Sequence, residues 1–568
     1  MTRQKGIMVA LLVAAAAANA ASPLYEDRWF YSSHAFEGER NFAFYRDLIA
    51  TASTNGYNGL LLARGLEGCG SWGAAKRESF LRLKALCDKS GIEIIPVIWS
   101  VGYGTMIGRD LELVESMPVS GIPYVARNGK GSFAPQSIDF PNGDFESFDA
   151  SRNRFSHWSS DLPGSISFVE TNVAHSGVAS IRFEPDPDKG KYAHARLSRT
   201  VPVRPGHRYR VTAFVRADEI HPGGCLRAQV YSKGARDAIA ARSIDGLEAK
   251  EGWRGISLEF NAGEATAVTL WIGTWGARSG RFWIDDCLIE EASLREVCRR
   301  EGTPFVVRGA ASGRVYSAGR DYELPRVRMP NGGDISFAIP KGSAIKEGES
   351  LLVDAYIPSR SGPNDQWSTC MSDPRLYELF GRSAEAMMSL FAPRKWFLSV
   401  DEVRNGNTCP LCTARGTDMA HIFGASVTRM HGIIRRVRPD AVVYAWSDML
   451  DPNHNAHDNY YGTKGTFAGV WNLIPKDIVI CCWYRARRDR SLPFFTGLGF
   501  RVMGAGYYDY DGDDVGPDRL WIESLNRTPG ATGLIYTTWC GKYALLPAFG
   551  RMLVEEGRPM AASPRRHP

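Results

Sequence analysis

The chain has 568 residues, of which 44% are hydrophobic and 23% are charged, and this composition excludes a disordered or collagen-like chain. Its 68 Lys and Arg residues against 62 Asp and Glu residues give a formal charge of +6. The basic residues are scattered along the chain, which argues against nucleic acid as a partner. The length allows several ordinary domains, or one barrel with additions.

Residues 1–20 have the pattern of a secretory signal peptide. Arg3 and Lys5 precede a short apolar run, 6–17, and Ala18-Asn19-Ala20 matches the small-residue cleavage pattern. The run is too short to span a bilayer comfortably, and no other stretch is long and apolar enough to do so. We therefore expect an exported protein, periplasmic or extracellular, with no integral membrane segment in the mature chain. Removal of the two basic residues lowers the formal charge to +4.

Two segments of the chain alternate strand-like and helix-like patterns. Their continuous apolar runs are typical of buried parallel strands. Eight such units predict an α/β fold, a TIM (β/α)8 barrel interrupted after strand three. An open doubly wound sheet is the alternative, but no Gly-rich phosphate-binding turn follows the first strand. The predicted strands lie near 28–36, 57–64 and 92–100, and then near 395–402, 441–449, 478–484, 501–509 and 533–540.

The block between the two segments has short strands of alternating polarity, separated by turn residues. This pattern predicts an all-β jelly-roll sandwich. The predicted organisation is a signal peptide at 1–20, a barrel in two parts at 21–135 and 361–560, the sandwich at 136–297 and a small β-rich segment at 298–360.

Adjacent carboxylates, Asp401 and Glu402, follow the buried run 396–400. Catalytic groups of a barrel enzyme lie at the carboxyl ends of its strands, and two carboxylates there must face a polar cavity because burying them elsewhere costs too much. A carboxyl held protonated can protonate a leaving oxygen while its neighbour orients the substrate. We predict Glu402 as the general acid and Asp401 as its partner. The competing interpretation is a surface pair in which Glu402 binds Arg404.

Aromatic and polar side chains occupy the ends of the other predicted strands. Aromatic rings can stack on the flat faces of sugars, while carboxylates and arginines bind their hydroxyls, as in pockets that are apolar with a few placed polar groups. We therefore predict a sugar-binding mouth lined by His34, Arg64, Trp99, Arg404, Trp446, Asp448, Trp483, Tyr507, Tyr508, Asp509 and Trp539.

Two clusters raise the question of a metal. Asp448, Asp451, His454 and His457 lack the spacing of known metal motifs, so we expect hydrogen bonding there rather than a metal site. Cys409-Pro410-Leu411-Cys412 is half of a zinc motif without a matching second pair. In an exported protein a short-range disulfide is the preferred interpretation.

The Asp401-Glu402 pair at strand four, with Trp at strands five and eight and Tyr-Asp at strand seven, resembles glycoside hydrolase family 20 β-N-acetylhexosaminidases. The resemblance implies a substrate-assisted mechanism, in which the 2-acetamido oxygen of the sugar attacks its own anomeric carbon. Asp401 would then orient the acetamido group, Glu402 would be the general acid/base, Tyr507 or Tyr508 would bond the acetamido oxygen, and Trp539 would wall the pocket.

The chain departs from that family at two places. Phe397-Leu398-Ser399-Val400 stands where the family has His-x-Gly-Gly, and Trp539-Cys540-Gly541 stands where it has Trp-x-Glu. If substrate assistance fails, a two-carboxylate mechanism is open, with Glu402 as acid and Asp448 or Asp509 as partner.

The inserted block, from Asn142-Gly143-Asp144-Phe145-Glu146 to Trp283-Ile284-Asp285-Asp286, resembles carbohydrate-binding modules of the CenC type. The resemblance implies a sugar groove lined by Tyr231, Trp271 and Trp275. It also implies a structural calcium, with Asp144, Glu146 and Asp286 as candidate ligands; no other cofactor is expected. The alternative is a purely structural sandwich.

Together these patterns predict an exported glycoside hydrolase, a glycosidase acting on oligo- or polysaccharides. One alternative is a non-catalytic carbohydrate-binding protein on a barrel scaffold. The other is a metal-dependent hydrolase that uses the cluster from Asp448 to His457.

Overall fold

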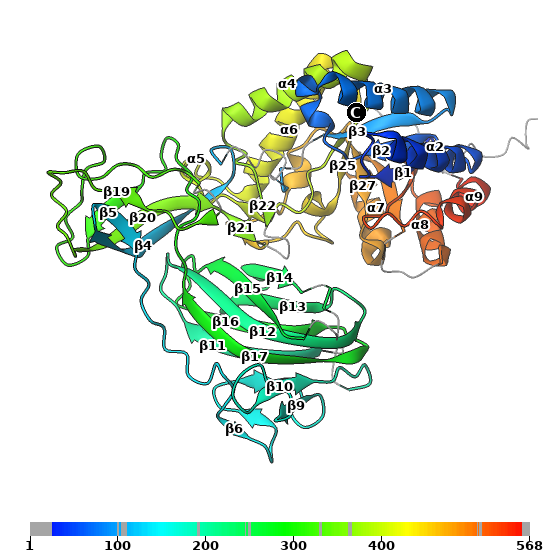
Figure 1. The fold of residues 1–568 in the computed structure, drawn as a ribbon. Helices are drawn as coiled ribbons and strands as arrows, with labels where there is room; N and C mark the ends of the chain where they lie inside the picture. The colour runs from blue at the N-terminus through cyan, green and yellow to red at the C-terminus, as the bar shows by residue number, and fades with distance from the viewer. Residues whose placement is uncertain are drawn as a thin grey trace, which may run out of the picture.

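The computed structural model has three parts, namely a closed barrel, a β-sandwich and a small separate sheet (Figure 1). The signal-peptide region, Trp99 and Tyr508 lie outside the residues that it describes. Within these residues, no helix has the length and apolar character needed to cross a membrane. The described residues are 25–98, 101–103, 111–189, 194–244, 246–247, 252–328, 332–361, 366–507, 509 and 514–558.

Eight parallel strands close into the barrel, and the last pairs with the first. This confirms the predicted barrel strands and the interruption after the third. In order around the barrel they are β1 (Asp27–Ser32), β2 (Gly59–Leu62), β3 (Glu93–Ile98), β23 (Lys395–Leu398), β25 (Val442–Trp446), β27 (Val479–Cys482), β28 (Arg501–Gly506) and β29 (Ala531–Tyr536).

Helices surround the barrel strands, except in one connection. Residues 447–478, between β25 and β27, are all described and form the 3-10 turns η7 (Asp448–Leu450) and η8 (Val470–Asn472) with the short strand β26 (Gly462–Thr463). The regular alternation expected from the sequence is therefore replaced here by a long irregular loop. The helices are α2 (Glu39–Thr54), α3 (Ala74–Lys89), α4 (Pro374–Phe391), α5 (Pro410–Thr413), α6 (Met419–Val437), α7 (Arg488–Gly497), α8 (Gly516–Asn526) and α9 (Leu546–Glu556), with further 3-10 turns η2 (Leu66–Ser71) and η9 (Arg485–Arg487).

Side chains fill the barrel interior, so it is a packed core rather than a pore. Trp29, Phe397 and Met503 are among the buried residues of this inner core. At the amino end of the strands, the buried Asp27 accepts hydrogen bonds from Lys395 Nζ and Tyr444 Oη, each at 2.8 Å. The polar groups of the candidate site lie at the opposite, carboxyl end of the strands.

Two five-stranded antiparallel sheets form the sandwich, as the alternating pattern predicts. Along β12 (Arg208–His221), inward residues are buried and alternate with partly exposed ones, which is the pattern of a sheet with one face in the core. One sheet has the order β15 (Arg254–Asn261), β12, β17 (Ser279–Glu291), β10 (Ser180–Phe183), β9 (Ser167–Glu170). The other has the order β14 (Ala240–Ser243), β13 (Leu226–Ser232), β16 (Ala267–Trp275), β11 (His194–Pro202), β8 (Ser159–Ser160), and a hairpin of β6 (Phe148–Asp149) and β7 (Arg154–Phe155) lies beside them.

A third five-stranded sheet joins the two ends of the insertion. Its order is β18 (Val306–Gly309), β20 (Ser350–Pro358), β4 (Ser116–Arg127), β5 (Lys130–Phe133), β19 (Phe337–Ala338). Residues 116–133, within the range expected for the first part of the barrel, thus pair with the β-rich segment that follows the sandwich. Two short pairs lie nearer the barrel, β21 (Arg360–Ser361) with β22 (Gln366–Trp367) and β24 (Asn405–Gly406) with β26.

The seam between β1 and β29 requires glycine at position 533. A Cβ atom there would lie 1.7 Å from the carbonyl oxygen of Asp27, and a backbone atom of the neighbouring strand cannot move aside without separating the strands. We expect Gly533→Ala to destabilise the protein by about 3 kcal/mol or more, beyond the usual cost of overpacking. The midpoint of thermal unfolding measures this.

Gly432→Ala in α6 is the matched control. No atom lies within 4 Å of a Cβ at position 432, so alanine should stabilise the helix by about 0.5–1 kcal/mol. Equal unfolding midpoints for the wild-type protein and Gly533→Ala would contradict the interpretation of the seam.

Candidate active site

Three carboxylates, Asp401, Glu402 and Asp448, gather where β23 and β25 end. The backbone N–H of Glu402 donates to Asp448 Oδ2 at 2.9 Å, and Ser399 Oγ donates to Asp401 Oδ1 at 2.7 Å. Glu402 has a φ of +46°. That left-handed conformation is uncommon outside glycine and costs about 1–3 kcal/mol where it is held, most often at functional sites. The hydrogen bond from its N–H to Asp448 stabilises this turn.

Both carboxylate oxygens of Glu402 have protein partners. Tyr103 Oη donates to Oε2, and Arg404 Nη2 lies 2.9 Å from Oε1. Gln366 accepts a hydrogen bond from Arg404 and donates from Nε2 to the carbonyl oxygen of Glu402 at 2.8 Å. The ion pair of the competing interpretation therefore forms, but Arg404 is only 7% exposed. It is part of a buried network rather than a surface pair.

Tyr103 and Gln366 are site residues that sequence reasoning missed. Tyr103 lies next to Gly102, where a Cβ would be 2.2 Å from the carbonyl oxygen of Asp401. Glycine lets this segment lie directly against the backbone of the carboxylate pair. Burial, followed by the negative charge of Glu402, holds the pKa of Tyr103 above its ordinary value, so its hydroxyl remains a donor. Only the Gly-Tyr pair just after the third strand signalled this contact.

The pKa values of two members of the carboxylate cluster are raised. Burial raises the pKa of Asp448 to about 7, and the charges of Asp401 and Glu402 add to the effect. Burial and the charge of Glu402 raise the pKa of Asp401 to about 6. Both shifts favour the protonated form of a carboxyl, which is the form that general acid catalysis requires.

Aromatic side chains form a wall beside the carboxylates. The ring of Trp539 lies 4.6 Å from that of Tyr31 and 6.1 Å from that of Trp446, which in turn packs on Phe397 at 4.6 Å. Trp446 is buried, whereas Trp539 is 44% exposed. An exposed indole next to polar groups offers an apolar face and a hydrogen-bond donor to a ligand. The structure thus brings these two predicted tryptophans together.

Asp509 holds the loop that carries Trp539. Its carboxylate accepts hydrogen bonds from Thr538 Oγ1 at 2.5 Å, from the N–H of Trp539 at 2.6 Å and from that of Cys540 at 3.1 Å. Both oxygens are occupied. Asp509 therefore positions the exposed indole.

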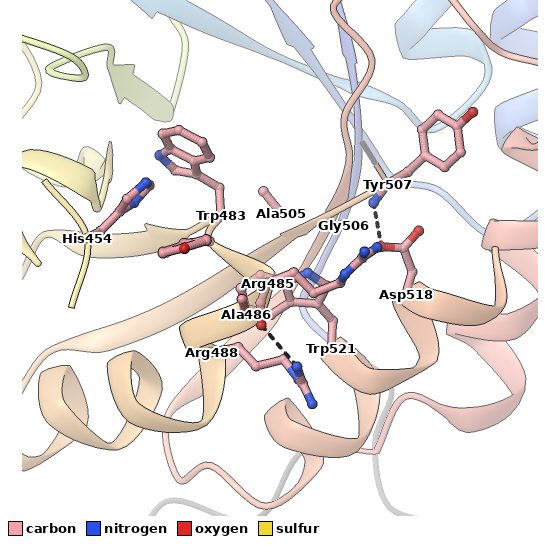
Figure 2. Close-up of a pocket in the computed structure, with 11 residues that line it drawn as sticks. His454, Trp483, Arg485, Ala486, Arg488, Ala505, Gly506, Tyr507, Asp518 and Trp521 are labelled. Carbon is pink, nitrogen blue, oxygen red and sulfur yellow. Dashed lines mark hydrogen bonds between the residues drawn. The ribbon is translucent and has the colours of Figure 1, made fainter. Parts of the chain in front are cut away.

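A cavity of about 390 Å³ lies beside the cluster, at the carboxyl ends of β27 and β28. Trp483 connects the two, since its Nε1 donates to Asp448 Oδ1 at 3.4 Å and its ring packs on His454 at 4.4 Å. Figure 2 shows His454 and Trp483 together on one side of this cavity. Burial lowers the pKa of His454 to about 4, so its imidazole is neutral.

Three of the predicted substrate-binding residues do not reach the carboxylates. Tyr507 stacks on Tyr536 at 5.1 Å in the core outside the barrel, and Figure 2 shows its ring turned away from Trp483. His34 packs on Phe44 of α2 at 4.0 Å. Arg64 is exposed after β2 and, among the described residues, has no hydrogen bond or ion pair to the cluster. The sequence pattern places residues at strand ends but does not determine the direction of each side chain.

The candidate metal ligands considered above are separate in the structure. Asp448, Asp451, His454 and His457, all described, do not form a group of three or more metal-ligating atoms. In the sandwich, Glu146 accepts hydrogen bonds from the backbone N–H groups of residues 178 and 179, Asp286 binds His175 at 2.5 Å, and Asp144 is exposed. The disulfide predicted between Cys409 and Cys412 is not formed, because both cysteines are free in the structure.

The outward face of one sandwich sheet presents aromatic residues in register. Trp271 stands opposite Gln229, and the guanidinium of Arg196 lies 4.5 Å from the Trp271 ring and 5.6 Å from that of Trp275. Asp161 holds Arg196 at 2.9 Å. Tyr231, Trp271 and Trp275 are all partly exposed. The three predicted sugar-groove residues therefore share one polar and aromatic face.

This sheet adjoins the barrel mouth (Figure 1). Asp237, between β13 and β14, accepts a hydrogen bond at 3.2 Å from the N–H of Tyr461, in the long loop after β25. The Tyr461 ring lies 5.0 Å from the guanidinium of Arg404, which binds Glu402. Contacts thus run from the edge of the sandwich to the carboxylate cluster.

No protein-family model matches the chain, and no curated protein matches it. Similar solved structures include TmCBM61 in complex with β-1,4-galactotriose, at 17% identity over 28% of this chain and 100% of that one, with a TM-score of 0.22. A CBM4 structure has 14% identity over 28% of this chain and 100% of that one, with a TM-score of 0.20. A putative sugar-binding protein from Bacteroides thetaiotaomicron has 9% identity over the same shares, 28% and 100%, with a TM-score of 0.20. At these TM-scores the similarities carry no functional argument.

The raised pKa of Asp448 predicts a specific dependence of stability on pH. The folded-state value, about 7, exceeds the unfolded value of 3.8, so the folded protein binds this proton more tightly. This contribution to stability is full below about pH 4 and is lost as the pH rises toward 7, by up to about 1.4 kcal/mol per pH unit. Asp448→Asn should make the stability of the protein less dependent on pH between 4 and 7.

Urea unfolding at half-unit pH steps measures the effect. Asp458→Asn, an exposed aspartate in the same loop, is the control and should follow the wild-type curve. Identical slopes for Asp448→Asn and the wild-type protein would show that Asp448 does not titrate in this range.

Proposed function

We propose that the protein is an exported glycoside hydrolase with a TIM-type barrel, and that it cleaves glycosidic bonds at the mouth formed by Asp401, Glu402 and Asp448. The observation that supports this most is the group of three carboxylates at the carboxyl end of the barrel, in which burial raises the pKa of Asp401 and of Asp448. It lies beside the exposed face of Trp539. A glycosidase needs both parts, a carboxyl that is protonated near neutral pH and an apolar surface for a sugar ring.

In the proposed mechanism Glu402 is the general acid/base. Asp448 is fully buried, whereas the Glu402 side chain is 20% exposed and can reach a substrate. Glu402 gives its proton to the leaving oxygen as the glycosidic bond breaks. Tyr103 and Arg404 then stabilise the carboxylate that remains. Asp448 maintains the turn at Glu402 by accepting the hydrogen bond from its backbone N–H.

We further propose a terminal N-acetylhexosamine as the sugar. Asp401 would orient the acetamido N–H while the acetamido oxygen attacks the anomeric carbon and the aglycone leaves with the proton from Glu402. Glu402 then removes a proton from water, which attacks the same carbon as its bond to the acetamido oxygen breaks, and the sugar is released with retained configuration. Tyr507 faces the outer core, so it does not supply the bond to the acetamido oxygen in this mechanism.

We assign glycan binding to the sandwich face of Tyr231, Trp271 and Trp275. Its supporting features are the partly exposed rings, the polar Gln229 opposite Trp271 and the arginine held over two indoles. The contact of this sheet with the barrel mouth through Asp237 favours a glycan that is bound by the sandwich and presented to the barrel.

A non-catalytic carbohydrate-binding protein is the second candidate. The observation that favours it is the pairing of both Glu402 oxygens, with Tyr103 and with Arg404. A cationic partner stabilises the ionised carboxyl and so opposes its use as an acid. Binding of glycans without turnover by the wild-type protein would support this candidate.

Glu402→Gln should lower kcat on 4-nitrophenyl N-acetylglucosaminide by roughly 10²–10⁴-fold, the usual contribution of general acid–base catalysis. The loss should be smaller with 2,4-dinitrophenyl glycosides, because a better leaving group needs less protonation. Steady-state kinetics on both substrates measure this. A panel of other nitrophenyl glycosides identifies the sugar.

Glu523→Gln, an exposed glutamate on α8, is the control and should retain wild-type kinetics. Equal losses on both leaving groups would contradict the assignment of Glu402 as the acid. Full activity of Glu402→Gln would overturn the proposed site.

Trp271→Ala should weaken binding of a polysaccharide by about tenfold, or about 1.4 kcal/mol, and leave kcat on a nitrophenyl monosaccharide unchanged. The lost stacking surface lies on the sandwich, away from the carboxylates. Affinity electrophoresis with soluble glycans measures the binding. Trp253→Ala removes an indole that packs on His175 at 5.7 Å, beside the other sheet, and should bind normally. If Trp271→Ala also binds normally, this face is not the glycan site.

A further inference from the structure

A buried cluster of three cysteines and one glutamate lies away from the carboxylates. Cys370, Cys409, Cys412 and Glu115 are all buried, and their potential ligand atoms lie within 4.8 Å of one another. They come from three separate places in the chain. Glu115 directly precedes β4, Cys370 lies just before α4, and the other two cysteines are at the start of α5. From these residues we propose a structural zinc site, independent of the proposed hydrolase function.

The distances match tetrahedral zinc rather than a disulfide. Cys370 Sγ lies 3.4 Å from Cys409 Sγ and 3.9 Å from Cys412 Sγ. Zn–S bonds of about 2.3 Å at tetrahedral angles place two sulfurs about 3.8 Å apart. A disulfide needs about 2.05 Å between them. Cys412 Sγ lies 3.4 Å from Glu115 Oε2, close to the roughly 3.6 Å expected between a sulfur and a carboxylate oxygen on one zinc ion.

The carboxylate of Glu115 is oriented for such a role. Its Oε1 atom accepts hydrogen bonds from the N–H of Thr408 at 2.8 Å, from Thr408 Oγ1 at 3.0 Å and from the N–H of Cys409 at 2.8 Å. Its other oxygen, Oε2, lies on the side of the sulfurs, 3.4 Å from Cys412 Sγ. Hydrogen bonds that fix one oxygen of a ligating carboxylate are a regular feature of metal sites.

A zinc ion would balance the charges of the ligands that it binds. Metal binding displaces the thiol protons, so three ligating thiolates and one ligating carboxylate carry four negative charges. Arg300 lies beside the sulfurs, where its charge acts on Cys409 and Cys370. It is held by the carbonyl oxygen of Val114 at 3.0 Å. A divalent ion together with this arginine leaves only one net negative charge.

Ligand type and number indicate zinc in a structural role. Soft thiolates select zinc over calcium or magnesium, and four protein ligands close the coordination sphere, as in structural rather than catalytic zinc sites. The Cys-x-x-Cys spacing across the first turn of α5 is the ordinary spacing of one half of such a site. The second half comes from residues far away in the sequence.

The proposed zinc would fasten both ends of the insertion to the barrel loop that follows Glu402. The N–H of Glu115 donates to the carbonyl oxygen of Ser368, and that of Cys370 to Leu113, each at 2.8 Å. The strands that enter and leave the insertion therefore meet at this point. Arg404 and Asn405 lie between the carboxylate pair and Cys409, so the ion would stabilise the supporting side of the candidate active site.

The test is metal content and coordination of the full mature chain, purified without chelators. We expect about one zinc per chain by inductively coupled plasma mass spectrometry, in line with the closed four-ligand site. Replacement by Co²⁺ should give thiolate-to-cobalt charge-transfer bands and the visible bands of a tetrahedral ion. Cys412→Ser should lose the zinc, and Glu115→Gln should change the cobalt spectrum. Cys87→Ala, a fully buried cysteine of α3 outside the cluster, should keep both.

A chelator should lower the unfolding temperature of the wild-type protein and of Cys87→Ala. If Cys412→Ser does not fold, the wild-type protein alone decides through its metal content, cobalt spectrum and free-thiol count. Zinc-free protein with a disulfide among Cys370, Cys409 and Cys412, found by mass spectrometry without reduction, would overturn the proposal. Unchanged zinc content in Cys412→Ser, or an unchanged cobalt spectrum in Glu115→Gln, would overturn the assigned ligand set.

Discussion

The hydrogen bond between the backbone N–H of Glu402 and the buried carboxylate of Asp448 is the interaction on which the candidate site depends. It joins the ends of two neighbouring barrel strands, β23 and β25. It also holds Glu402 at a positive φ that a non-glycine residue rarely adopts. Asp448 is buried where it makes this bond, and burial raises its pKa.

The insertion contributes to the site as well as interrupting the barrel. Gln366, on the strand that returns from the insertion, binds Arg404 and the backbone of Glu402. Asp237 of the sandwich contacts the loop after β25, which carries Tyr461 over Arg404. This loop is also the one connection where 3-10 turns replace a helix. The irregular part of the barrel is therefore the part that the inserted sheets support.

Much of the fold could be predicted from local pattern. The eight apolar runs correspond to β1, β2, β3, β23, β25, β27, β28 and β29, and the alternating polarity of the insert predicts the sandwich. Asp401, Glu402, Asp448, Trp446, Trp483 and Trp539 lie around one mouth because parallel barrel strands bring their carboxyl ends together. Tyr507 does not join them, since its ring stacks on Tyr536 outside the barrel. A residue at a strand end is free of the alternation that sets direction within the strand.

The sequence by itself determined the elements whose signal is short in range, namely the strands, the sandwich and the Asp401-Glu402 pair after a buried run. Only the tertiary structure decided which distant residues meet. Tyr103 and Gln366 reach Glu402, β4 pairs with β20 across the whole sandwich, and Cys370 and Glu115 complete the cluster that Cys409 and Cys412 begin. The physical reason is that hydrophobic periodicity reports which face of an element is buried, whereas hydrogen bonds and metal-ligand geometry depend on pairings between segments that no local pattern encodes.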